Sequence, residues 1–306
     1  MTKRNVISGF LEATAMEINM QSVKKFFCAL LLSGHCIVSA AAEPAVAMVT
    51  DLEGKAVLLD DARKPAVSIL SEVRQDAKVQ IEAGGRLVAV YLNSGQSWEM
   101  KGPAIVQFRL QQPEAESGAK PQPRGNALSK GSKDIRIKPV AVAQAAIVMR
   151  SVKPNLKLKL LNPLGNKTLE ERPLFAWKSL APDLPYRFAL LDDTGKTLYE
   201  TSVNDTSLQL PSQVQLKEAA TYTWMVSAQH PEGMTFSNAS DFSLASADLR
   251  RQVEALRPAA NAPFAERIAF AAWLEQMALR DEARKYWKTA AAERPDDPRL
   301  KVMAGE

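Results

Sequence analysis

The chain has 306 residues, of which 46% are hydrophobic and 24% are charged, and its formal net charge is +5. The hydrophobic fraction is too high for a disordered chain, and its 18 prolines and 14 glycines lack the regular period of a fibre. Two cysteines cannot build a disulfide-dense scaffold. From the chain length we expect a soluble protein with two or three hydrophobic cores.

The first 42 residues have the pattern of a secretory signal peptide. Two lysines precede a short apolar run over 26–32, and a stretch of small residues follows it. The A-x-A spacing of Ala40 and Ala42 predicts cleavage after Ala42, with a cut after Ala47 as the alternative. Met20 starts a segment of ordinary signal length, so residues 1–19 can come from an over-long start assignment.

Cleavage would change the chemistry that remains in the chain. Both cysteines and one of the two histidines lie in the signal, so the mature chain keeps His230 alone and a net charge of +3. An uncleaved membrane anchor is the alternative, although the apolar run is shorter than the ~20 residues of a spanning helix. We expect a periplasmic or secreted protein without a stable membrane span.

Residues 46–110 alternate apolar and polar side chains as short antiparallel strands do. Ala83-Gly84-Gly85 separates two apolar runs and predicts a tight hairpin, because glycine accepts the positive φ of hairpin turns. A second turn follows at 93–96, and an earlier pair of strands surrounds Glu53-Gly54. A small barrel or double-sheet β domain is the expected product.

This β segment resembles the FecR-like periplasmic domain, a family of repeated β-hairpins. The resemblance is carried by 49–58, 70–72, 77–79, 83–87 and 90–95. The best-known members regulate a sensor through a cytoplasmic segment and a single membrane span. This sequence has no such segment before its signal, so only the β-domain fold is carried over, and we assign residues 46–150 to it.

A basic, Pro/Gly-rich stretch over 111–139 is expected to be a linker or long loop within that domain. Between Ser117 and Lys138 one acid, Asp134, stands against six basic residues: Lys120, Arg124, Lys130, Lys133, Arg136 and Lys138. The charge favours either a solvated loop or contact with an anionic envelope polymer. Nucleic acid is not expected, because the signal exports the chain and no aromatic residues interleave the charges.

Residues 153–245 contain seven short strand patterns separated by turn signals, which predict a β-sandwich. The placing of Trp177, followed by Leu216, Tyr222 and Trp224, resembles a fibronectin type III or immunoglobulin-like domain and its tyrosine corner. The three aromatic side chains are expected in the core, because each lies on an alternating strand; a sugar-stacking platform is the alternative.

Residues 246–306 change to helical periodicity, with Ser246 as a predicted N-cap and helices over about 263–277 and 281–293. The spacing of small, large and proline residues resembles one tetratricopeptide repeat, on Ala271, Leu274, Ala283, Trp287, Ala290 and Pro295. One repeat cannot bury its own faces. We expect it to pack on 249–256, on the sandwich or on another chain.

The residue types left in the mature chain argue against an enzyme. The mature chain has no cysteine to bind zinc or to act as a nucleophilic thiol. A serine triad would need His230, which is predicted to lie in a turn, and no phosphate-binding glycine motif occurs. Asp60-Asp61 is expected to be a turn rather than an acid–base pair. We therefore predict no catalytic, cofactor-binding or metal-binding residues.

The expected fold class is mainly β: a small FecR-like domain and a sandwich, followed by a C-terminal helical hairpin. The expected function is that of an exported interaction or scaffold protein in envelope signalling or assembly, whose partner is another envelope protein. An envelope-polymer-binding module that uses the basic loop is the alternative.

Overall fold

The computed structural model describes residues 44–306 except 61, 127, 129–157 and 231–232. The described chain is mainly β and ends in four helices, so the predicted fold class is confirmed. The predicted signal peptide and the basic residues from Lys130 to Lys138 lie outside the described residues. The extent of the domains as we assigned them stays a prediction.

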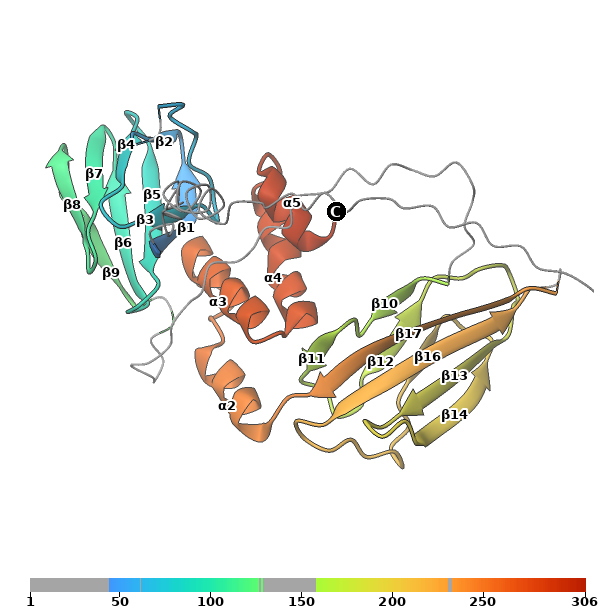
Figure 1. The fold of residues 1–306 in the computed structure, drawn as a ribbon. Helices are drawn as coiled ribbons and strands as arrows, with labels where there is room; N and C mark the ends of the chain where they lie inside the picture. The colour runs from blue at the N-terminus through green and yellow to red at the C-terminus, as the bar shows by residue number, and fades with distance from the viewer. Residues whose placement is uncertain (1–43, 61, 127, 129–157, 231–232) are drawn as a thin grey trace, which may run out of the picture. The chain divides into compact units, whose positions relative to one another are not determined.

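The first β domain consists of two antiparallel sheets whose inner faces share one core (Figure 1). The five-stranded sheet has the order β3-β1-β5-β6-β9 and the four-stranded sheet the order β2-β4-β7-β8. The strands are β1 (Ala45–Glu53), β2 (Ala56–Leu58), β3 (Glu72–Arg74), β4 (Lys78–Ile81), β5 (Arg86–Tyr91), β6 (Gln96–Lys101), β7 (Ala104–Phe108), β8 (Pro113–Ser117) and β9 (Gln122–Asn126).

The hairpin predicted at Ala83-Gly84-Gly85 is wrong, because β4 and β5 belong to different sheets. Glycines also lie where the chain crosses between sheets after β1, β6 and β8. At Gly102 a Cβ would stand 1.8 Å from the carbonyl oxygen of Glu82, so no side chain fits there. A glycine that allows a close backbone approach at a corner looks the same in sequence as one that allows a hairpin turn. The turn predicted at 93–96 does join paired strands, β5 and β6.

The predicted loop over 111–139 is wrong in its first half. Residues 113–117 form β8, which pairs with β7, and residues 122–126 form β9, which pairs with β6. Proline and glycine suggested a loop, but both strands lie at sheet edges, where a missing backbone N–H costs no ladder bond.

The second β domain consists of a three-stranded sheet, β10-β12-β15, and a five-stranded sheet, β11-β17-β16-β13-β14, around one core. β11 was not predicted from the sequence; it is short and pairs in parallel with β17. The strands are β10 (Leu160–Asn162), β11 (Asn166–Thr168), β12 (Leu174–Trp177), β13 (Tyr186–Leu191), β14 (Thr197–Val203), β15 (Ser207–Gln209), β16 (Thr221–Gln229) and β17 (Thr235–Leu244).

The aromatic residues of this domain form its core, as predicted. Trp177, Tyr222 and Trp224 are all buried, so they offer no platform for sugar stacking. The hydroxyl of Tyr222 accepts a hydrogen bond of 2.6 Å from the backbone N–H of Lys217, which is the contact that defines a tyrosine corner.

The C-terminal helices are α2 (Ala247–Leu256), α3 (Phe264–Gln276), α4 (Arg280–Glu293) and α5 (Pro298–Ala304). The predicted N-cap is confirmed, because the Ser246 side chain accepts from the backbone N–H of Leu249. Helix α5 was not predicted; Asp297 caps it by accepting from the N–H groups of Arg299 and Leu300.

The helices bury their apolar side in part against the first β domain. Met48, Val90 and Leu92, on the outer face of its five-stranded sheet, belong to the same core cluster as Ile268 and Trp287. The packing partners expected from the sequence did not include this domain. A helix period shows which side is apolar, but it does not identify the surface that covers that side.

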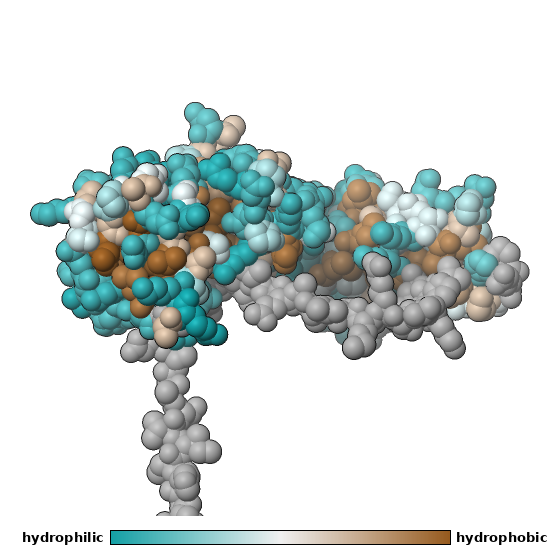
Figure 2. Space-filling model, turned by 90° about the horizontal axis from the view of Figure 1, so that it is seen from above, coloured by the Kyte–Doolittle hydropathy of each residue, from teal (hydrophilic) through white to brown (hydrophobic). Residues whose placement is uncertain are grey.

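The surface seen in Figure 2 is mainly hydrophilic, with smaller hydrophobic areas between the polar residues. Large apolar side chains that are exposed include Leu110 and Met234. Within the described ranges no helix is both long and apolar enough to span a bilayer.

Candidate site: a charged cleft beside helix α3

Buried polar side chains gather at one place in the first β domain. Thr50, Asp51, Ser97 and Glu99 are at most 5% exposed, and they account for four of the five buried polar residues among those described. Asp51 and Glu99 are carboxylates, which are almost never buried unless they are paired. This cluster on β1 and β6 is therefore the first candidate for a functional site.

A β-bulge in β1 places the carboxylates on the outer face of the sheet. The register with β5 pairs Val49 with Ala89 and then Asp51 with Val88, so Thr50 is an extra residue. Strict alternation would have directed Asp51 to the inner side with Val49. The bulge instead directs Asp51 and Glu53 outward and leaves Leu52 beside the core.

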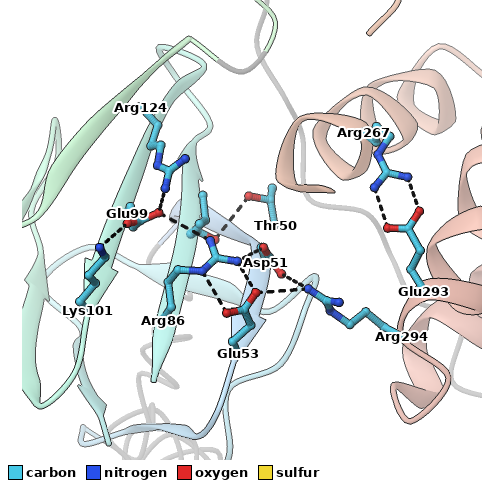
Figure 3. A network of polar contacts seen from close by, with 11 residues as sticks. Thr50, Asp51, Glu53, Arg86, Glu99, Lys101, Arg124, Arg267, Glu293 and Arg294 are labelled. Atoms are coloured by element: carbon cyan, nitrogen blue, oxygen red, sulfur yellow. Dashed lines mark hydrogen bonds and ion pairs between the residues drawn. The ribbon is translucent and has the colours of Figure 1, made fainter. Parts of the chain in front are cut away.

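Arg86 of β5 is the central cation of the cluster (Figure 3). Its guanidinium lies 2.5 Å from Oδ2 of Asp51, 2.7 Å from Oε1 of Glu53 and 3.6 Å from Oε2 of Glu99. Hydrogen bonding to Arg86 holds the pKa of Glu53 below its ordinary value, and the same contacts raise the pKa of Arg86. Both groups therefore stay charged at neutral pH.

Arg124 of β9 is the second arginine of the cluster and pairs with Oε2 of Glu99. Lys101 lies 3.4 Å from the other oxygen of the same carboxylate. Arg124 was one of the basic residues expected in a solvated loop, and that prediction is wrong for this residue, because it is anchored on a strand. Of the same set, Lys120 is exposed.

Arg294, the C-cap of α4, reaches the cluster from the helical segment (Figure 3). Its guanidinium lies 3.4 Å from Oε1 of Glu53 and 3.6 Å from Oδ1 of Asp51. It also stands 4.9 Å from the ring centroid of Phe264, the first residue of α3. These contacts are longer than those that Arg86 makes with the same two carboxylates, so Arg294 is bound to them less tightly than Arg86.

A cleft of about 420 Å³ opens over this cluster. Its walls carry three arginines, which are Arg86, Arg124 and Arg294, and three carboxylates, which are Asp51, Glu53 and Glu266. The first turn of α3 forms another part of the wall. The lining is thus neutral in total charge but strongly polar, and its volume lies within the range of about 300–1,000 Å³ typical of small-ligand sites.

The arrangement favours recognition over proton transfer. A general base works best when its pKa lies near the working pH, whereas an arginine partner stabilises the ionised carboxylate and lowers its pKa. Glu53 is held in this way. The cleft can instead offer several fixed hydrogen-bond donors and acceptors at once.

The residues weighed from the sequence for catalysis or metal binding lie elsewhere. Asp60 accepts a hydrogen bond from the backbone N–H of Lys78 at a strand end, and Asp61 lies outside the described residues. The His230 ring packs edge-on against Phe236. Among the residues that the structure describes, no group of three or more His, Cys, Asp or Glu side chains could hold a metal ion.

The charged cluster itself was not found from the sequence. Its members come from β1, β5, β6, β9 and the end of α4, and each is of a residue type that is common on protein surfaces. A usable signal was present in β1, where the apolar run over 45–49 ends in two adjacent polar residues, Thr50 and Asp51, at the position of the bulge.

Comparisons with known proteins support no conclusion about fold or function. No family model matches the chain, and no curated protein matches it significantly. Among solved structures, CopC from Methylosinus trichosporium OB3b is similar at 15% identity and a TM-score of 0.22, over 29% of this chain and 93% of that one. A similarity this weak does not bear on function.

Proposed function

We propose that the protein is a non-enzymatic, exported interaction protein of the cell envelope, and that the charged cleft takes part in binding its partner. The observation that carries the proposal is the pair of buried, arginine-paired carboxylates, Asp51 and Glu99, beside an open cleft that Asp51 lines. Burying charges is costly, and hydrophobic residues of similar size would often be at least as stable. A polar cluster kept at such a position is therefore more readily explained by recognition than by stability.

The FecR-like and tetratricopeptide-like assignments remain part of this proposal. The packing of the helices on the first β domain supports a single binding body that includes both. Their shared apolar cluster would hold the cleft walls, β1 and α3, in a fixed relation, which reduces the ordering cost of binding.

Affinity capture from intact cells after chemical crosslinking tests the proposal, with the partners identified by mass spectrometry. We expect one envelope protein to be retained by the wild-type chain and lost with Arg294→Gln. The matched control is Arg187→Gln, which breaks an exposed ion pair with Glu200 on the sandwich and should keep the partner.

The salt dependence separates this function from polymer binding. Binding driven by exposed basic residues should weaken steeply as ionic strength rises, because charges beyond a Debye length of about 8–10 Å are screened. Retention on purified wall material that disappears at moderate salt, together with no captured protein, would replace our proposal with the polymer-binding alternative.

A further inference from the structure

We propose that strand β14 is the interface of a homodimer, in which two copies of the chain pair their β14 strands antiparallel and join their five-stranded sheets into one. The pairing is centred on Thr201, which lies opposite the Thr201 of the second copy. Strand β14 belongs to the sandwich and does not line the charged cleft. The inference therefore goes beyond the proposed function and does not depend on it.

Strand β14 differs from the other edge strands of the four described sheets. Of the eight edge strands, β2, β3, β10, β11 and β15 have three residues each, and β8 and β9 contain proline. Strand β14 has seven residues and contains no proline, glycine or lysine. Short length, proline and lysine are common protections of an edge against pairing with another chain, and β14 lacks all three.

The backbone of 199–203 is ready to pair on its outer side. In the described part of the chain β14 has one neighbouring strand, β13 (Figure 1). The register with β13 skips Leu198, so the bulge lies near the start of β14 and leaves 199–203 regular. In an antiparallel pair, alternate residues direct their N–H and C=O groups to the neighbour, and the residues between them direct theirs away. An added strand would bond to those outward groups.

The inward side of β14 is only partly covered. Tyr199 and Val203 pack against the sandwich core, yet both stay partly exposed. The ring of Tyr199 lies 6.3 Å from the ring of Phe188 in that core. A strand placed beside β14 would cover the remaining surface of Tyr199 and Val203. Removing this apolar area from water favours the pairing.

The side chains of β14 match those of a second copy in one register. A pairing centred on Glu200 would set this carboxylate opposite itself, and like charges directly opposite each other are destabilising. A centre at Tyr199 would include the bulge. A centre at Thr201 instead sets Glu200 opposite the small Ser202 of the second copy and Tyr199 opposite its Val203. This self-complementarity identifies the occupant of the edge as a second copy of the chain.

The assembly should close at two copies. A two-fold pairing uses the same edge of both copies, so no β14 edge remains free. The opposite edge of the sheet is β11, where the backbone N–H of Lys167 already donates to the carbonyl of Ala278 at 2.7 Å. We therefore expect a dimer and not a growing sheet.

Sedimentation velocity of the whole chain at increasing concentration tests the dimer. We expect a reversible monomer–dimer equilibrium in the micromolar range. Ser202→Glu sets a carboxylate opposite Glu200 of the other copy, twice in each dimer, and should weaken the dimer about tenfold. Ser202→Lys is the matched variant and should strengthen the dimer several-fold, because attraction replaces repulsion. Ser202 is exposed and lies opposite Arg187 in its own sheet, so the glutamate gains a cation beside it. Thermal unfolding verifies that both variants are folded.

Cysteine crosslinking tests the register. The Cα atoms of directly opposed residues in an antiparallel pair lie about 4.5–5.5 Å apart, a distance that a disulfide spans. On oxidation Thr201→Cys should therefore form a disulfide between two copies, located by peptide mass spectrometry. Ser202→Cys should not, because it lies opposite Glu200. A monomer at every concentration, a dimer that responds equally to Ser202→Glu and Ser202→Lys, or a crosslink formed by Ser202→Cys but not by Thr201→Cys would overturn the inference.

Discussion

At the scale of single residues, Arg86 is the side chain on which the buried charges depend. It contacts Asp51, Glu53 and Glu99, and two of these carboxylates are almost fully buried. Arg86→Met keeps most of the side-chain volume but leaves those charges without their main partner. We expect a loss of about 3 kcal/mol in the free energy of unfolding, measured by urea denaturation at pH 7.

The matched exposed pair gives the control for this loss. Arg187→Met on the sandwich should cost no more than about 0.5 kcal/mol, because exposed ion pairs contribute little. Similar losses in the two variants would show that burial does not set the strength of the Arg86 contacts.

Glu275 of α3 should respond to pH with the opposite sign from Glu53. Burial raises the pKa of Glu275, whose carboxylate accepts a hydrogen bond of 3.2 Å from the Trp287 indole. A raised folded-state pKa means that stability is present at low pH and is lost as pH rises through that value. Glu275→Gln keeps an acceptor for Trp287 and removes the charge. It should stabilise the chain at pH 7 by at most about 1 kcal/mol, because the side chain is partly solvated.

Thermal unfolding across pH checks this expectation. The gain of the Gln variant should shrink towards zero in acid, where the wild-type carboxyl group is protonated in both the folded and the unfolded chain. A gain that is independent of pH would mean that packing, rather than charge, is responsible.

At the scale of elements, the crossings between the two sheets of the first β domain depend on glycine. A Cβ at Gly102 would overlap the carbonyl oxygen of Glu82, so Gly102→Ala should destabilise the domain by at least about 3 kcal/mol. Gly84→Ala is the comparison, because that residue has φ +75° but nothing within 4 Å of an added Cβ. It should cost only about 1 kcal/mol for the left-handed backbone.

Urea denaturation of the two variants distinguishes these causes. Equal losses of stability would mean that the close approach at Gly102 is not the reason why a glycine is needed there.

At the scale of the whole molecule, the helices and the first β domain share one apolar cluster, so they should unfold cooperatively. Ile268→Ala removes a fully buried side chain of α3 and should cost about 2–4 kcal/mol. Amide hydrogen exchange should then show faster exchange in β1 and β5 as well as in α3. The strands β13 and β16, whose core is separate, serve as the internal reference. Faster exchange confined to the helices would show that the cluster does not couple the two parts.

The sequence alone determined the type of most elements, because side-chain periodicity is a local property. The alternation of apolar and polar residues predicted the strands around Trp177 and Trp224 and the burial of both side chains. A polar residue before an apolar helical pattern identified Ser246 as a cap. The strands β8 and β9 were missed for a local reason too, since prolines and glycines are compatible with both loops and sheet edges.

Only the tertiary structure decided how those elements meet. It determined that Gly84-Gly85 turns the chain into another sheet, that a bulge at Thr50 directs Asp51 outward, and that α3 packs on β1. It also brought Arg86, Arg124 and Arg294 to one cluster of carboxylates, in which Arg294 pairs with Glu53 from 241 residues away along the chain. The physical reason is that hydrogen bonding between strands, burial of one face against another and charge pairing act between residues that are distant in sequence. No local pattern records their partners.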